Sequence, residues 1–233
     1  MLKFIVATIV AIILFSLVPV NALASPNLLQ AETGVTLPPS GLEFTGGVSF
    51  GYPGSPFDLQ LSYGAFPSVT VVGEFTNQSL FPVEGSASNG GDGARKLVKV
   101  LWSPKHKDQG YTVYLGYEMD RAFIPFYGVS LWADYKYLLA FVNLQTTVAS
   151  VDGVPVTPVT VTPGVSLKFG SKLQVGGEVE VKPGDWRTQK LRLGMDYALF
   201  QRIRAKLTIQ TDLNNLIPDF TNPIYQTGFT FSI

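Results

Sequence analysis

The chain contains no cysteine and only one histidine among its 233 residues. Without cysteine, a disulfide scaffold and thiolate metal sites are excluded. Charged residues make up 15% of the chain, whereas about a quarter is usual for a soluble domain. The 17 basic and 17 acidic residues balance, so the basic excess typical of nucleic-acid binding is missing. We therefore expect no nucleic-acid partner.

The N-terminus has the features of a secretory signal peptide. Lys3 precedes an apolar run from Phe4 to Val18, and the small-residue site Ala22-Leu23-Ala24 follows. These features predict cleavage after Ala24. An uncleaved anchor is the alternative, but the run is shorter than the ~20 apolar residues of a spanning helix. The signal peptide predicts that the protein is exported. After residue 24 no apolar run is long enough for a membrane-spanning helix.

Most of the chain after residue 41 alternates between apolar and polar residues. Because successive side chains of a strand point to opposite sides, this pattern predicts β-strands with one apolar and one polar face. The segment 123–143 is apolar on both faces, and a turn near Asp134-Tyr135 divides it into two strands. Twelve strands are predicted, with ten or fourteen as alternatives: 42–52, 57–64, 69–76, 96–102, 111–118, two within 123–143, 159–170, 172–182, 187–197, 202–212 and 225–233.

The predicted connections favour an all-β, antiparallel up-and-down transmembrane β-barrel over residues 42–233. Every long connection falls in one alternate set: 53–56, 77–94, 119–122, 145–157, 183–186 and 213–222. Transmembrane barrels have an even number of strands, short turns at the periplasmic end and longer loops outside.

A soluble barrel, with its apolar face inward, is the alternative to a membrane barrel. Three features favour an apolar face directed to lipid. The strands approach the ~9–11 residues of a membrane-crossing strand, and the polar face is rich in Gly, Ser, Thr and charges of both signs. Aromatic residues of the apolar face lie near strand ends, as in interfacial girdles: Tyr52, Phe57, Tyr63, Phe75, Trp102, Tyr111, Tyr117, Phe169, Tyr197 and Tyr225.

The C-terminal segment 226–233 resembles the terminal strand of outer-membrane β-barrel proteins. The pattern is carried by Gln226, Gly228, Phe231 and Ile233, although an aromatic residue is commoner than isoleucine at the last position. This resemblance implies an outer-membrane location, contact with the lipid bilayer and recognition by the barrel-assembly machinery. Thr33-Gly34 and Leu37-Pro38-Pro39 are similar to segments of exopolysaccharide-associated outer-membrane barrels, which implies an envelope polysaccharide as a partner.

The sequence offers little material for catalysis. Barrel hydrolases need a histidine on the outer half of a strand beside Ser or Asp, but His106 lies in the predicted turn 103–110. Asp92, in a Gly/Asn-rich segment, is interpreted as part of a flexible loop rather than a calcium site. We expect neither an enzyme nor a bound cofactor or metal.

Charged residues of the polar face are the candidate site. A turn at 183–186 predicts that Glu178 faces Arg192 and Glu180 faces Lys190, and the next hairpin predicts that Asp196 faces Arg202. Opposite charges across a strand pair stabilise each other by roughly 0.2–1 kcal/mol. The predicted lumen-lining charges are Lys168, Glu178, Glu180, Lys190, Arg192, Asp196, Arg202, Arg204 and Lys206.

Two functions follow from this pattern. The first is a narrow passive channel for small solutes, in which the basic residues form a wall that selects anions. The second is a structural or polymer-binding surface barrel without a conducting pore, in which ion pairs fill the interior. Twelve strands lie between the roughly eight that fill their own interior and the 16–18 that leave an aqueous channel. Residues 25–41 either plug the lumen or extend into the periplasm.

Overall fold

The computed structural model describes residues 36–50, 57–76, 95–104, 108–119, 123–151, 154–183, 185–214 and 217–233. Within these ranges the chain contains no helix with the length and hydropathy needed to cross a membrane. The strands are β1 (Leu42–Phe50), β2 (Phe57–Phe66), β3 (Val69–Thr76), β4 (Arg95–Trp102), β5 (Gln109–Met119), β6 (Phe123–Asp134), β7 (Leu138–Thr147), β8 (Ala149–Val151), β9 (Val154–Val156), β10 (Val159–Phe169), β11 (Leu173–Lys182), β12 (Asp185–Phe200), β13 (Ile203–Asn214) and β14 (Ile217–Ser232).

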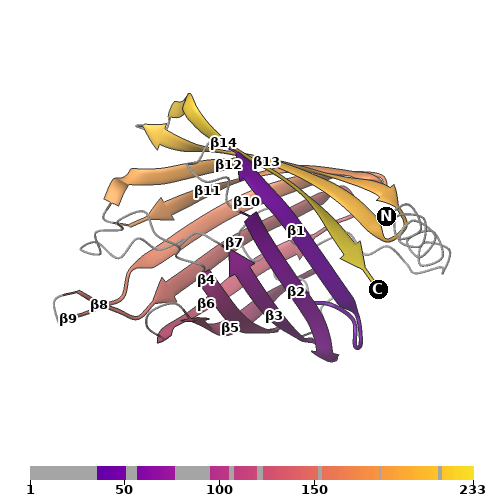
Figure 1. Cartoon of the computed structure of the whole chain (residues 1–233), viewed down its shortest axis with the longest axis horizontal. Helices are drawn as coiled ribbons and strands as arrows, with labels where there is room; N and C mark the ends of the chain where they lie inside the picture. Colours follow the sequence, from indigo (N-terminus) through magenta and orange to yellow (C-terminus); the bar gives the residue numbers. More distant parts are fainter. Residues whose placement is uncertain are drawn as a thin grey trace, which may run out of the picture.

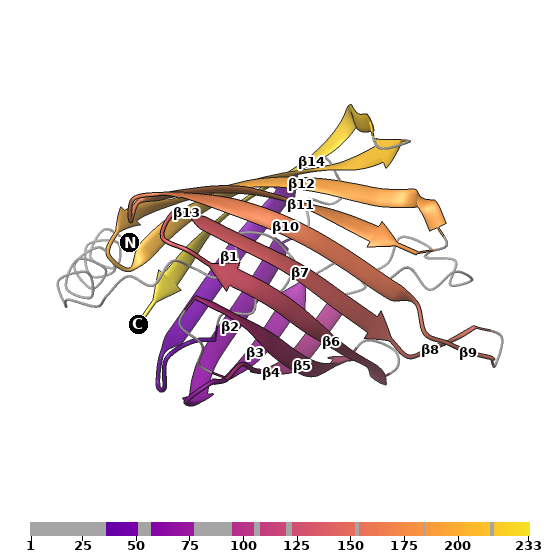
Figure 2. The same cartoon turned by 180° about the vertical axis from the view of Figure 1, so that it is seen from behind.

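Twelve of these strands form one closed antiparallel barrel (Figure 1). Each barrel strand pairs with the barrel strands before and after it in the chain, and β1 closes the ring by pairing with β14 from Glu43↔Ser232 to Phe50↔Tyr225. Closure leaves no edge strand in the barrel. The remaining strands, β8 and β9, form a separate hairpin that extends from one end of the barrel (Figure 2). The predicted twelve-stranded up-and-down barrel is confirmed.

Two predicted connections are shorter than the sequence indicated. The β11–β12 hairpin pairs as far as Lys182↔Asp185, and the β13–β14 hairpin as far as Asn214↔Ile217. Both hairpins continue beyond a register shift, which the alternation pattern alone does not reveal. The connections from β1 to β2, from β3 to β4 and from β7 to β10 all leave the same end of the barrel, and β1 begins and β14 ends at the other end.

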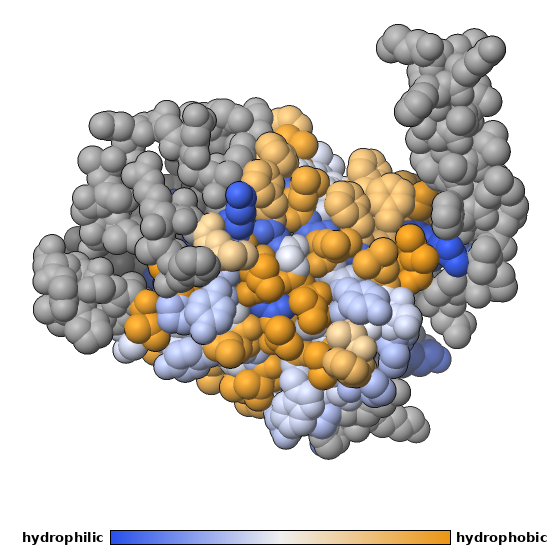
Figure 3. Space-filling view, turned by 60° about the horizontal axis from the view of Figure 1, so that its bottom comes forward, coloured by the Kyte–Doolittle hydropathy of each residue, from blue (hydrophilic) through white to orange (hydrophobic). Residues whose placement is uncertain are grey.

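The apolar face of the strands points outward. On β5, Leu115 belongs to the outward set and is 53% exposed, whereas Thr112 belongs to the inward set and is fully buried. The same alternation runs through β1 and β2, and apolar side chains dominate the visible outer surface in Figure 3. This orientation is the reverse of a soluble barrel, whose apolar face fills a dry interior. The outward direction of the apolar face is confirmed.

Most of the predicted girdle aromatics are exposed on the outer surface. Phe75 is half-buried against Phe57, with ring centroids 5.6 Å apart, and Tyr52 lies outside the described residues. The exposed members are Phe57, Tyr63, Trp102, Tyr111, Tyr117, Phe169, Tyr197 and Tyr225.

Candidate channel interior

Eight of the nine predicted charges lie on four adjacent strands. Lys168 is on β10, and Glu178 and Glu180 are on β11. Strands β12 and β13 carry five more of these charges. Arg202 is buried in the turn between β12 and β13. The charges on the last two strands are Lys190, Arg192 and Asp196 on β12, and Arg204 and Lys206 on β13.

Arg192 is the centre of the largest ion-pair network in this group. The predicted register is confirmed, since Glu178 pairs with Arg192 and Glu180 with Lys190. The Arg192 guanidinium lies 2.8 Å from Glu178 Oε1 and 2.5 Å from Glu180 Oε2, and its Nε donates to Gln210 Oε1 at 2.7 Å. Because the Glu178 and Arg192 side chains are 0% and 5% exposed, their charges depend on each other for solvation.

The predicted pairing of Asp196 with Arg202 is wrong. Asp196 lies opposite Lys206, and Arg204 Nε donates to Asp196 Oδ1 at 2.5 Å. The pairing of β12 with β13 shifts between Ala198 and Phe200. This irregularity changes the register by a single residue. The main cause is the turn itself: β12 continues to Phe200 and the chain turns at Gln201-Arg202, later than predicted, so Asp196 meets residue 206 instead of residue 202.

The two halves of the inner face differ in their balance of charge, and an ion pair between Lys168 of β10 and Asp134 of β6 links them. Among the described side chains, β10–β13 carry six basic residues against four acidic ones, and β1–β6 carry one basic residue against five acidic ones. The first group is Lys168, Lys182, Lys190, Arg192, Arg204 and Lys206 against Glu178, Glu180, Asp196 and Asp212. The second is Lys99 against Glu43, Asp58, Glu74, Glu118 and Asp134. Strands β10–β13, whose inner face we call the basic wall, therefore carry an excess of two basic residues among the described side chains, and β1–β6 carry an excess of four acidic residues.

Apolar side chains also occupy part of the inner face, which the sequence pattern did not predict. They form two buried clusters on β3–β7, which we call the aromatic wall: Val72, Leu97, Leu101, Tyr114 and Phe126 in one, and Leu139 and Phe141, packed by Trp132, in the other. Most of these residues alternate with outward apolar neighbours, so these strands are apolar on both sides over much of their length. The clusters fill space that a purely polar inner face would leave to water.

Glycines opposite these rings let them lie flat against the wall. Tyr114 pairs with Gly128, and Phe126 pairs with Gly116 on the same two strands. A Cβ at either glycine would overlap the opposing ring. The Tyr114 ring crosses over β6, and its hydroxyl donates to Asn143 Oδ1 on β7 at 2.8 Å. Phe141 lies over Gly164 of β10 in the same way.

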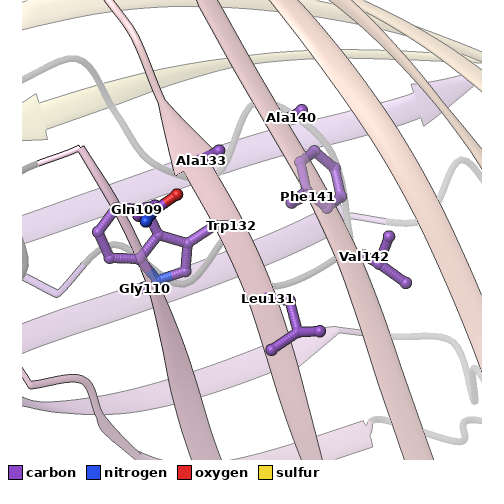
Figure 4. Close-up of a pocket in the computed structure, with 8 residues that line it drawn as sticks. All are labelled: Gln109, Gly110, Leu131, Trp132, Ala133, Ala140, Phe141 and Val142. Atoms are coloured by element: carbon purple, nitrogen blue, oxygen red, sulfur yellow. The ribbon is translucent and has the colours of Figure 1, made fainter.

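A hollow of about 530 Å³ lies in the wall between β5, β6 and β7. Figure 4 shows Ala133 and Ala140 on neighbouring strands, with the Trp132 ring extending toward β5. Five of the eight lining residues belong to the outward set, and the two alanines oppose each other. The hollow is therefore a depression of the outer surface and does not belong to the barrel interior. The outward lining residues are Gln109, Leu131, Ala133, Ala140 and Val142.

Three of the four predicted assembly-signal residues lie on β14, the strand that closes the barrel, and Ile233 follows its last residue directly. Phe231 and Ile233 are exposed on the outer face, whereas Gln226 and Gly228 are half-buried. Gly228 pairs with Gly47, and a Cβ at Gly228 would overlap the Gly46 carbonyl oxygen. The glycine thus has a packing role at the closing seam. Recognition by an assembly machinery stays a prediction.

The structure does not test the interpretation of the single histidine or of the Gly/Asn-rich loop. His106 and Asp92 lie outside the described residues. Within the described part of the chain, no three His, Cys, Asp or Glu side chains come together as a possible metal site.

Comparison with solved structures identifies the fold. A KdgM porin in complex with disordered oligogalacturonate superposes with a TM-score of 0.60 at 12% identity, covering 83% of this chain and 99% of that one. The NanC porin gives a TM-score of 0.54 at 15% identity, covering 82% and 98%. No family model and no curated protein sequence matches the chain. The twelve-stranded barrel, with its apolar outer face, has the fold of these outer-membrane porins.

Proposed function

We propose that this protein is a passive outer-membrane channel for small solutes that carry carboxylate groups, such as acidic oligosaccharides. The observation that carries the proposal is the difference in charge balance between the two halves of the inner face. A solute between β10–β13 and β1–β6 experiences a transverse field, because low-dielectric walls focus the potential of fixed charges. Carboxylates would follow the basic wall. The oligogalacturonate bound to the KdgM porin is a solute of this chemical class.

Ion selectivity in planar bilayers tests the proposal. Lys190 and Lys206 are half-buried on the inner face, so changing both to glutamine should move the reversal potential in a KCl gradient toward cation selectivity. Lys96 is exposed and belongs to the outward set of β4. Lys96→Gln is therefore a matched control that should leave the reversal potential unchanged. The absence of stepwise conductance from the refolded protein would refute the channel.

Solute preference is tested in the same recordings. Short oligogalacturonates should block the current at lower concentration than neutral oligosaccharides of equal length. The difference should shrink in the Lys190→Gln/Lys206→Gln variant and remain in Lys96→Gln. Equal block by acidic and neutral sugars would contradict the preference for carboxylates while leaving the channel intact.

A polymer-binding surface barrel is the second candidate. The β8–β9 hairpin favours it, because this hairpin extends beyond the barrel wall at the end that carries the longer connections (Figures 1 and 2). Deleting residues 149–156 should then abolish binding to envelope polysaccharide and leave heat-modifiable gel mobility intact. In a channel of the first kind the same deletion should not change ion selectivity.

A further inference from the structure

We infer that residues 36–41, which we call the mouth turn, form a constriction inside the barrel mouth and limit the size of solutes that pass. This inference rests on the proposed channel function. The mouth turn precedes β1, at the end of the barrel where two-residue turns join β2 to β3 and β12 to β13. Short turns mark the periplasmic end of transmembrane barrels.

The chain reverses direction within the mouth turn. The Gly41 N–H donates to the Pro38 carbonyl oxygen at 2.9 Å, and Ser40 has a φ of 63°. Proline at the second position and a positive φ at the third are the features of a type II β-turn. Pro39 is the proline at the second position of this turn, and Ser40 is the residue at the third. The residues before the turn are thereby directed back over the barrel instead of away from it.

Contacts with β2 and β3 place the mouth turn on the inner side of the wall. The Leu37 N–H donates to Thr70 Oγ1 at 2.8 Å, and both residues are buried. The Ser40 N–H donates to the Gly64 carbonyl oxygen at 2.8 Å, and the Gly64 N–H donates to the Gly41 carbonyl oxygen at 2.9 Å. Thr70 and Gly64 both belong to the inward set of their strands. The mouth turn therefore occupies part of the opening.

Gly64 is the residue on which this arrangement depends. The Pro38 carbonyl oxygen lies where a Cβ of residue 64 would stand. A larger side chain at this position and a docked mouth turn exclude each other. Gly64→Val is thus a specific way to displace the mouth turn. Gly73→Val on β3 is the matched control, since nothing lies within 4 Å of a Cβ at Gly73.

Cysteine labelling measures whether the mouth turn is docked, independently of conductance. The chain has no cysteine, so Leu37→Cys provides a single reactive site for a membrane-impermeant maleimide. Labelling should be about tenfold faster with Gly64→Val, the factor that corresponds to losing roughly one buried hydrogen bond. Gly73→Val should not change the rate. Thr70→Val, which removes one hydrogen bond without adding a clash, is the second variant, and heat-modifiable gel mobility verifies folding of each.

Liposome swelling with neutral sugars of increasing size then tests the constriction. We expect Gly64→Val to admit larger sugars than the unmodified protein or Gly73→Val. Unchanged labelling of Leu37→Cys, or an unchanged size limit in a channel that conducts, would overturn the inference alone. If Gly64→Val conducts and the unmodified protein does not, the mouth turn is a plug, and both the passive channel and the size limit are refuted for the unmodified protein. If neither conducts, the proposed channel function fails and the constriction fails with it.

Discussion

Strands β10–β13 and strands β3–β7 enclose the same interior, but different interactions hold their inward side chains. On β10–β13, ion pairs such as Arg192 with Glu178 and Glu180 are buried. On β3–β7, rings such as Tyr114 and Phe126 pack on each other and over glycines. The basic wall can attract a solute charge, whereas the aromatic wall fills space and holds neighbouring strands together.

The two walls should therefore respond differently to substitution. Removing one member of a buried ion pair leaves a charge without a partner, which is costly in a low-dielectric environment. Removing a polar group from the aromatic wall costs only a hydrogen bond or a packing contact. The free energy of unfolding measures the effect of substitutions in both walls on one scale. It is obtained by urea unfolding in phospholipid vesicles, followed by tryptophan fluorescence.

Arg192→Met should have the largest effect. Glu178 and Glu180 would remain on the inner face without their guanidinium, and the free energy of unfolding should fall by about 3–5 kcal/mol. Adding Glu178→Gln and Glu180→Gln to this variant should recover most of the loss, because the uncompensated charges are then gone. A loss below about 1 kcal/mol for Arg192→Met alone would mean that water reaches these carboxylates.

Gly128→Ala should destabilise the aromatic wall by about 1–3 kcal/mol, the usual cost of overpacking. The added methyl group would overlap the Tyr114 ring. Gly73→Ala, on the outer face, is the control and should leave the free energy of unfolding unchanged or slightly higher, since glycine weakens a strand interior. Equal results for the two variants would show that the ring is not held against Gly128.

Tyr114→Phe should cost about 0.5–1.5 kcal/mol, the net contribution of a typical hydrogen bond. The ring stays over Gly128, but the bonds to Asn143 and Gln145 across β6 are lost. A double variant with Asn143→Ala should lose less than the sum of the two single losses. Strict additivity would indicate that the hydroxyl does not join β5 to β7.

Lys182→Gln should have the smallest effect. Lys182 Nζ lies 4.0 Å from Glu180 Oε1, and its side chain is 31% exposed. Exposed ion pairs contribute about 0–1 kcal/mol, so the change in unfolding free energy should stay near the lower limit of that range. A loss as large as that of Arg192→Met would remove the distinction between the buried network and its exposed margin.

Alternation of residue types predicted the barrel because a half-buried strand repeats every two residues. It identified the inward face of β10–β13 correctly, since Glu, Lys and Arg occupy one side there. It did not identify the inward face of β6 and β7, where Phe126 and Phe141 alternate with residues that are also apolar, so the aromatic wall was missed. The fit of Tyr114 over Gly128 requires the register between strands, which residue spacing within one strand does not contain.

The register of the charged hairpins was predicted only in part. The turn at 183–186 gave the pairs of Glu178 and Glu180 correctly, because the strands on either side are regular near these residues. The predicted β12–β13 pairing failed at Asp196, because β12 continues to Phe200 and turns only at Gln201-Arg202, whereas the alternation pattern placed the end of the strand at residue 197. The mouth turn could not be located from the sequence, although Pro39 followed by Ser40-Gly41 suits a tight turn.

The central claim is that the apolar side of each strand faces lipid and that the polar side encloses water. Nitroxide labels at single cysteines on β2 test it most directly in reconstituted vesicles. With Leu59→Cys and Leu61→Cys, oxygen should relax the label more than a water-soluble nickel chelate does, and Gln60→Cys should behave in the opposite way. Greater access of the nickel chelate at Leu59 and Leu61 than at Gln60 would contradict the account.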